Sequence, residues 1–237
     1  ELWRRLASIY GERLSRFDLA ARAWNECLTR DPKDTFVLEA LAQIYRSTSQ
    51  YRELSVVMRR QLGLEPNVAG QVNLLFDLAT LAEDTLSDKP LAATAYQAIL
   101  ERKPDDGNAL KLLGRLFAEM EKWPELAGVL AREVQQAEAQ GQDEEARELL
   151  VRLGRLKLTR LGDPRGALNT YQEVLRRKPG HAGAVGALEE MARSDNPLKG
   201  EAANTLEPVF AHEGEHLKLV QMIEAQVTSE TQPAERA

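Results

Sequence analysis

The sequence of 237 residues has a single cysteine, few aromatic residues and no long hydrophobic run. One cysteine rules out an internal disulfide framework but does not distinguish between cellular compartments. Because no run reaches the roughly 18 apolar residues that a membrane-spanning helix needs, we expect no membrane span in this segment. Ile, Val and Thr are sparse beside Ala, Leu, Arg and Glu, which favours helices over strands. The hydrophobic fraction of 43% is nevertheless high enough for a folded protein.

Positive charge is also in deficit, since the formal net charge is −6. Nonspecific nucleic-acid binding needs clustered Lys and Arg, so nucleic acid is not an expected partner. There is no Gly-rich phosphate loop, no Ser-His-Asp arrangement in a strand context and no cysteine pair. We therefore expect no enzyme activity and no cofactor. The chain starts inside a helical pattern at Glu1, without a cap, which predicts a piece of a longer protein with further repeats and leaves the location open.

One short stretch recurs three times and organises the chain. It reads WNECLTRDP at Trp24–Pro32, YQAILERKP at Tyr96–Pro104 and YQEVLRRKP at Tyr171–Pro179. In each copy an alanine lies four residues before the aromatic residue, and apolar residues follow three and four after it, all on one helical face. The proline then ends the helix, because it lacks the N–H group and biases the preceding residue towards an extended conformation. The prolines lie 72 and 75 residues apart, as pairs of 34-residue repeats with small insertions would give.

Paired helical patterns fill the chain between and around these stretches. We predict five helical hairpins as far as Pro179 and another that ends near residue 227, with one extra residue between the helices of the first, third and fifth. Asp-Lys-Pro at 88–90 and Gly-Asp-Pro at 162–164 predict helix starts, because aspartate caps free N–H groups and proline is tolerated in the first turn. Around 195–210 the pattern leaves open whether a helix is missing or merged. The polar residues 228–237 predict a disordered tail.

These hairpins resemble tetratricopeptide repeats (TPRs). The second copy matches the family pattern without gaps at Leu38, Leu41, Ala42, Tyr45, Leu54, Met58 and Pro66. It departs from that pattern at Leu54 and Gln61, where the family prefers alanine. The resemblance implies an all-α, right-handed α-solenoid of antiparallel helix pairs, with six to seven degenerate repeats in one domain over residues 1–227. The Ala/Arg/Leu-rich composition is similar to that of bacterial proteins of this class.

The resemblance also implies that the protein is a scaffold or adaptor, possibly within a larger bacterial assembly, that binds a protein or peptide in a concave groove lined by the first helix of each pair. The expected groove residues are Phe36, Glu39, Gln43, Asn73, Phe76, Thr80, Asn108, Lys111, Arg115, Arg152 and Arg155. Two of these are apolar where a solvated face would be polar, and four are basic. Together they suggest a peptide with an apolar anchor and an acidic flank. The alternative is an ordinary solvated face on which the phenylalanines pack locally.

One stretch, His-Glu-Gly-Glu-His at 212–216, matches the zinc-protease pattern H-E-x-x-H. That chemistry needs both histidines on a continuous helix, yet Gly214 falls where other copies place their interhelix turn, at Ser49 and Glu121. His216 also occupies the place of structural aromatic residues in earlier copies. We therefore interpret the stretch as a turn, and keep a zinc hydrolase and a helical-repeat RNA binder as alternatives to the scaffold.

Two further residues could carry chemistry. Cys27 takes the position of Ile99 and Val174 in sister repeats, which predicts a buried packing thiol. His181 follows Pro179-Gly180 in a turn without a partner nearby in sequence, which predicts a solvent-exposed side chain.

Overall fold

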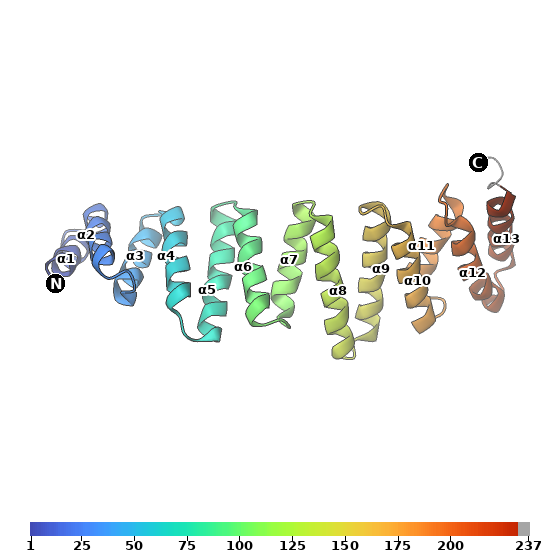
Figure 1. Ribbon diagram of the computed structural model, residues 1–237, viewed down its shortest axis with the longest axis horizontal. Coiled ribbons are helices and arrows are strands. Elements are labelled where there is room, and N and C mark those ends of the chain that lie inside the picture. The colour runs from blue at the N-terminus through green and yellow to red at the C-terminus, as the bar shows by residue number, and fades with distance from the viewer. Residues whose placement is uncertain (232–237) are drawn as a thin grey trace. The chain divides into compact units, whose positions relative to one another are not determined.

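The computed structural model describes residues 1–231, and every regular element in that range is helical (Figure 1). No strand occurs among these residues, so the prediction of an all-α chain is confirmed for them. The α-helices are α1 (Leu2–Ser8), α2 (Phe17–Arg30), α3 (Thr35–Ser47), α4 (Tyr51–Leu64), α5 (Val68–Thr80), α6 (Lys89–Arg102), α7 (Gly107–Glu119), α8 (Trp123–Ala139), α9 (Asp143–Thr159), α10 (Pro164–Arg177), α11 (Ala182–Arg193), α12 (Lys199–Glu213) and α13 (His216–Thr231). Two π-helical segments, η1 (Ile9–Arg13) and η2 (Leu81–Thr85), extend α1 and α5. None of the described helices combines the length and apolar character that crossing a membrane requires.

Contacts divide the chain into two compact units, with the boundary inside α7 after Leu116. The single repeat domain expected over residues 1–227 stays a prediction. In the first unit α1 packs on α2, α3 on α4 and α5 on α6, and successive pairs contact each other. In the second unit each helix from α8 to α13 packs on the next. Within each unit, neighbouring helices run antiparallel in chain order, as predicted for helical repeats (Figure 1).

The recurring small and aromatic residues form the core between paired helices. Ala20, Ala92 and Ala167 are fully buried, and Tyr96 and Tyr171 are 3% and 1% exposed. The small side chains let the helices approach closely enough for the aromatic rings to fill the space between them. The prediction that these alanine and tyrosine positions are buried is therefore confirmed.

The helices start and stop where the sequence indicates. Asp88 and Asp163 accept hydrogen bonds from backbone N–H groups in the first turns of α6 and α10, which satisfies donors that the helix leaves free. Four helices each end two residues before a proline: α2, α4, α6 and α10, before Pro32, Pro66, Pro104 and Pro179.

The extra residue in the first, third and fifth hairpins is absorbed as a widened helical turn. The N–H groups of Leu14, Leu86 and Leu161 each donate to the carbonyl five residues earlier. In the first and third hairpins this turn is the π-helical segment η1 or η2. A π turn accommodates one additional residue without breaking the helix, so the paired helices keep their register.

The sequence pattern left open whether a helix is missing or merged around residues 195–210, and the structure places α12 there. It packs on both α11 and α13, so one helix serves as the second member of one pair and the first member of the next. Leu206 and Phe210 are fully buried on it. Ile223 of α13, matched in sequence to the buried Leu130, is 42% exposed, because no further helix covers α13 within the described residues. α13 continues to Thr231, past residue 228, where the tail was expected to begin; residues 232–237 lie outside the described range.

The prediction of a buried Cys27 is corrected, since its side chain is only half-buried. The equivalent Ile99 and Val174 are fully buried. Partial burial still raises the pKa of the Cys27 thiol.

The prediction of an exposed His181 is wrong. His181 is 4% exposed and lies at the N-terminal cap of α11. Its imidazole faces two carboxylates of α9, which are remote in sequence.

Candidate functional site

The clearest cavity near the predicted groove residues lies in the first unit, between α1, α2 and α3. Its volume is about 520 Å³. It is lined by Ala7, Ser8, Gly11, Glu12, Phe17, Trp24, Phe36, Glu39, Ala40, Gln43, Ile44 and Ser47. We call it the α1–α3 pocket. Three of the expected groove residues, Phe36, Glu39 and Gln43, line this one cavity, which is large enough for a bulky side chain.

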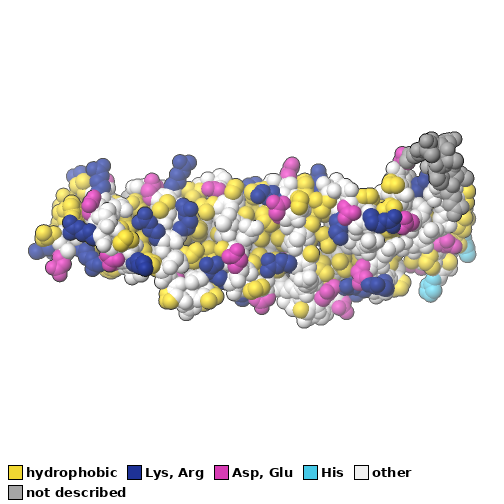
Figure 2. All heavy atoms as spheres, in the orientation of Figure 1, with side chains coloured by type: hydrophobic (Ala, Val, Ile, Leu, Met, Phe, Trp, Pro, Cys, Tyr) yellow, Lys and Arg dark blue, Asp and Glu magenta, His cyan; other side chains and the backbone are white. Residues whose placement is uncertain are grey.

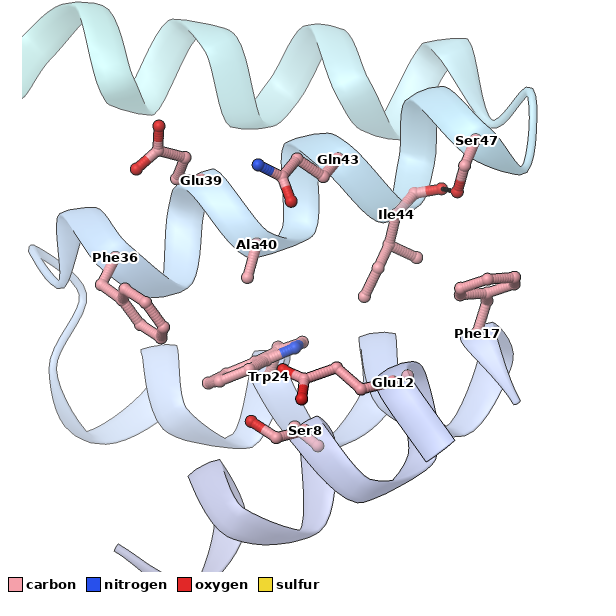
Figure 3. Close-up of a pocket in the computed structure, with 12 residues that line it drawn as sticks. Ser8, Glu12, Phe17, Trp24, Phe36, Glu39, Ala40, Gln43, Ile44 and Ser47 are labelled. Carbon is pink, nitrogen blue, oxygen red and sulfur yellow. Dashed lines mark hydrogen bonds between the residues drawn. The ribbon is translucent and has the colours of Figure 1, made fainter. Parts of the chain in front are cut away.

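Two aromatic residues give the α1–α3 pocket its apolar character. Trp24 is 4% exposed and is held in the core of the α1/α2 pair. Phe36 stacks edge-to-face on it with ring centroids 5.8 Å apart, yet remains 60% exposed. Figure 3 shows Phe36, Ala40 and Ile44 projecting from α3 into the cavity towards Trp24. The pocket is thus lined by a fixed indole and a phenyl ring that water still reaches.

Polar and acidic residues lie at the edge of this apolar surface. Ser8 and Glu12 approach the cavity from the first helix, opposite α3 (Figure 3). Glu12, Glu39 and Gln43 are exposed, so their polar groups reach solvent. An apolar centre with a few polar groups at its rim is typical of sites that bind a side chain in a defined orientation.

The predicted groove residues on α5 have a different environment. Phe76 is half-buried and packs edge-to-face on Tyr96, with centroids 6.1 Å apart, so this phenylalanine packs locally. Asn73 and Thr80 are exposed. Thr80 lines a separate cavity of about 310 Å³ between α4 and α5.

A polar network links η2, α6 and α7. The Tyr96 hydroxyl donates to Glu83 Oε1 at 2.8 Å, and Arg115 pairs with Glu83 Oε2 at 2.5 Å. Burial, and then the contact with the Glu83 carboxylate, raise the pKa of the Tyr96 phenol. Arg115 therefore has a carboxylate partner within the chain. Asn108 and Lys111 are exposed on the same helix.

The remaining predicted groove residues, Arg152 and Arg155, are exposed on α9 in the second unit. Burial raises the pKa of the nearby Tyr171 to about 12, an effect that the charge of Arg155 opposes. Within each unit, positive and negative side chains are interspersed on the face shown in Figure 2 and do not gather into a patch of one sign.

The structure divides the His-Glu-Gly-Glu-His stretch between two helices. α12 ends at Glu213, Gly214 is left-handed with φ of 72°, and α13 begins at His216. Ser49 and Glu121 adopt the same left-handed conformation in earlier interhelix turns, with φ of 57° and 55°. The two histidines are therefore not one turn apart on a continuous helix, and the turn interpretation is confirmed.

The sequence analysis did not predict the surroundings of two residues, Trp24 and His181. It assigned Trp24 to the core and did not predict that its ring would also line a pocket. It also placed His181 in solvent. Both residues gain their surroundings from helices elsewhere in the chain, a signal that a local pattern does not contain.

Comparison with known proteins gives matches among solved structures alone. Neither a protein-family model nor a curated protein matches the sequence. The structure of YrrB, described as a TPR protein with an unusual peptide-binding site, aligns with 16% identity and a TM-score of 0.37, over 79% of this chain and 90% of that one. MamA aligns with 14% identity and a TM-score of 0.34 over 97% of both chains.

The C-terminal part of a TPR repeat-containing protein from Cytophaga hutchinsonii aligns with 15% identity and a TM-score of 0.37, over 98% of this chain and 90% of that one. At such identities and TM-scores these similarities say nothing about ligands. The fold class is decided by the chain's own antiparallel pairs, buried repeat positions and interhelix turns. The chain has a TPR-like fold. Its TPR-like hairpins form the α1–α3 pocket, which is the candidate binding site.

Proposed function

We propose that this TPR-like chain is a protein-interaction scaffold and that the α1–α3 pocket takes a large apolar side chain of a partner protein or peptide. The observation that carries the proposal is Phe36, which is 60% exposed beside a cavity of about 520 Å³ floored by Trp24. An exposed aromatic ring next to a rigid apolar cavity is the surface on which an anchor residue contributes most to binding.

The fold would assist binding by holding this surface in advance. Trp24 is fixed by its burial in the α1/α2 pair, and Ala40 leaves room between the helices for an inserted group. A preformed site loses less conformational entropy when it binds than a site that must first become ordered. An extended or short helical peptide suits such a surface between helices.

Charged residues would set the flanks of the anchor. Glu12 and Glu39 at the pocket favour a neutral or basic residue directly beside the anchor. The acidic flank suggested by the sequence would instead contact exposed basic side chains of the predicted groove in the same unit, Lys111 and Arg115. The proposal therefore specifies an apolar anchor with a neutral or basic neighbour and acidic residues at a distance from it.

A peptide selection tests this function. Displayed random peptides are selected on the wild-type chain, and the dissociation constant of a selected peptide is measured by calorimetry or fluorescence anisotropy. We expect Phe36→Ala to weaken binding by about tenfold, or roughly 1.4 kcal/mol. Ala40→Trp, which fills the cavity without removing apolar surface, should weaken binding to a similar degree.

Leu217→Ala is the matched control, because Leu217 is 83% exposed on α13, far along the chain from the pocket. It removes exposed apolar surface and should leave the dissociation constant unchanged. Equal affinity of wild type and Phe36→Ala, or an equal loss in Leu217→Ala, would contradict the proposal. Circular dichroism of each variant checks that the helices remain folded.

A further inference from the structure

Three potential metal-ligand side chains meet in the second unit. Glu144 and Glu148 lie one turn apart on α9, and His181 lies at the start of α11. One ligand atom from each of the three lies within 4.8 Å of the others. We call this group the α9–α11 cluster. It is the one such group found among residues 1–231, and it does not include the histidines of the His-Glu-Gly-Glu-His stretch.

The buried histidine sets this cluster apart from an ordinary acidic surface. The side chain of His181 is 3% exposed, and its Nε2 atom faces both carboxylates. Its Nδ1 atom is buried and has no hydrogen-bond partner within the described part of the chain. A buried polar atom without a partner is unfavourable, but Nδ1 is the ring nitrogen that does not face the carboxylates, so the case for an ion rests on the placement of Nε2.

The distances fit a shared ion better than direct hydrogen bonds. Nε2 of His181 lies 3.5 Å from Glu148 Oε1 and 3.7 Å from Glu144 Oε1. Hydrogen bonds between nitrogen and oxygen usually span about 2.7–3.2 Å. Two ligands of one tetrahedral zinc ion lie roughly 3.3 Å apart, given bonds of about 2.0–2.1 Å. Small side-chain rotations would therefore bring all three atoms onto one ion.

Neighbouring cations orient Glu144 and keep it ionised. Arg147 donates to Glu144 Oε2 at 2.7 Å, and Lys178 lies 3.3 Å from the same oxygen. These contacts, that of Arg147 first, lower the pKa of the Glu144 carboxyl. Oε1 faces His181 and also lies 3.4 Å from Lys178 Nζ, so this ammonium group would have to move aside when an ion binds. Arg147 contacts Oε2 alone and would remain as an outer-sphere partner of the kind found in metal sites.

We propose that the α9–α11 cluster binds a divalent transition-metal ion of the zinc type through His181 Nε2, Glu144 and Glu148, with water completing the coordination. One imidazole and two carboxylates suit zinc, whereas magnesium and calcium prefer oxygen ligands alone. Both glutamates are more than half exposed, so the ion can enter from solvent. Binding would fasten α9 to the start of α11 and thereby stabilise the second unit.

Titration of the chelator-treated, metal-free chain with zinc chloride in a calorimeter tests the site. We expect one zinc ion per wild-type chain and a higher melting temperature in its presence. Glu148→Gln keeps the size of an exposed side chain and removes a ligand charge, so we expect at least about a tenfold loss of affinity and no zinc-induced rise in melting temperature. In chelator the variant should melt like the wild type, which shows that it is folded.

Two control variants separate the α9–α11 cluster from other zinc ligands in the chain. The double variant His212→Ala/His216→Ala and the single variant Cys27→Ser should both retain wild-type zinc affinity. If the wild type binds no zinc, or if the histidine double variant loses the binding while Glu148→Gln keeps it, the proposal is overturned.

Discussion

The N-terminal cap residues of α3 and α11 occupy the same position in the repeat but differ in charge and in the charge of their partners. Asp34 and His181 each lie two residues after a proline and each form the N-terminal cap of a helix. Asp34 accepts a hydrogen bond from Val37 N–H and also pairs with Arg4 of α1. His181 makes no side-chain cap bond and faces Glu144 and Glu148 of α9.

In both places a cap residue is in contact with the first helix of the preceding pair, so this position links consecutive repeats. At α3 the cap is acidic and its partner basic, whereas at α11 the two partners are acidic. A carboxylate can cap the helix and form the link at once, because it accepts several hydrogen bonds. The imidazole of His181 makes no cap hydrogen bond and faces Glu144 and Glu148 of the preceding repeat. The repeat geometry thus determines where consecutive repeats are in contact, and the type of cap residue determines which charged partner is bound at that contact.

The largest effect should come from placing the α3 chemistry in α11. His181→Asp puts a third carboxylate at a buried position against Glu144 and Glu148, so we expect the free energy of unfolding to fall by about 2–3 kcal/mol near neutral pH. Urea denaturation in the presence of a chelator measures it. His181→Asn, a neutral residue that also caps helices well, is the control and should be clearly more stable than His181→Asp. Equal stability of the two variants would show that the charge of the partners does not matter at this position.

Removal of the acidic cap residue of α3 should have a smaller effect on the free energy of unfolding. Asp34→Ala removes both the cap of α3 and the partner of Arg4, and we expect a loss of about 1–2 kcal/mol in the free energy of unfolding. Arg4→Ala removes the link and leaves the cap, so it should cost less, about 0.5 kcal/mol, since the arginine is half exposed. Thermal and urea unfolding of the two variants give the comparison. If Arg4→Ala is as destabilising as Asp34→Ala, the cap contributes nothing.

This contrast also explains which features the sequence could predict. Helix positions, the buried Ala-aromatic pairs and the turn at Gly214 follow from spacings within a repeat, because local geometry determines them. The exposure of Phe36 followed likewise from its position in the second repeat. His181 could not be placed in this way, since the carboxylates that surround it belong to a helix of another repeat.

Other misses have the same origin. Cys27 was assigned from its sister positions, but the burial of a side chain depends on the helices around it, which a position within the repeat does not reveal. The dual role of α12 depends on its packing with two neighbours, so the pattern could show a break in register but not its resolution. Trp24 belongs to the core by its spacing and to the α1–α3 pocket by the placement of α3.

A third cap residue, Asp106 of α7, occupies the same position in the repeat, and its contribution to stability can be tested by varying the pH. Asp106, two residues after Pro104, accepts from Ala109 N–H and from Lys103, each at 3.0 Å. Burial alone would raise the pKa of this carboxyl, but the hydrogen bonds from Ala109 and then Lys103 outweigh it and hold the pKa below its usual value. A carboxyl whose pKa is lower in the folded state stabilises the fold fully above its unfolded pKa of about 4, and this contribution is lost as the pH falls further.

Asp106→Asn should therefore change little near neutral pH, by less than about 1 kcal/mol, because asparagine still caps the helix. Its effect belongs to the acid range: below about pH 4 the stability of the variant should fall less steeply than that of the wild type. Urea midpoints measured across the acid range check this, with Asp105→Asn, an exposed neighbour, as the control. Because His181 lacks a carboxyl at this place, His181→Asn should leave the acid slope that Asp106 causes intact. An unchanged slope in Asp106→Asn would mean that the cap carboxylates do not contribute to the acid sensitivity of the repeats.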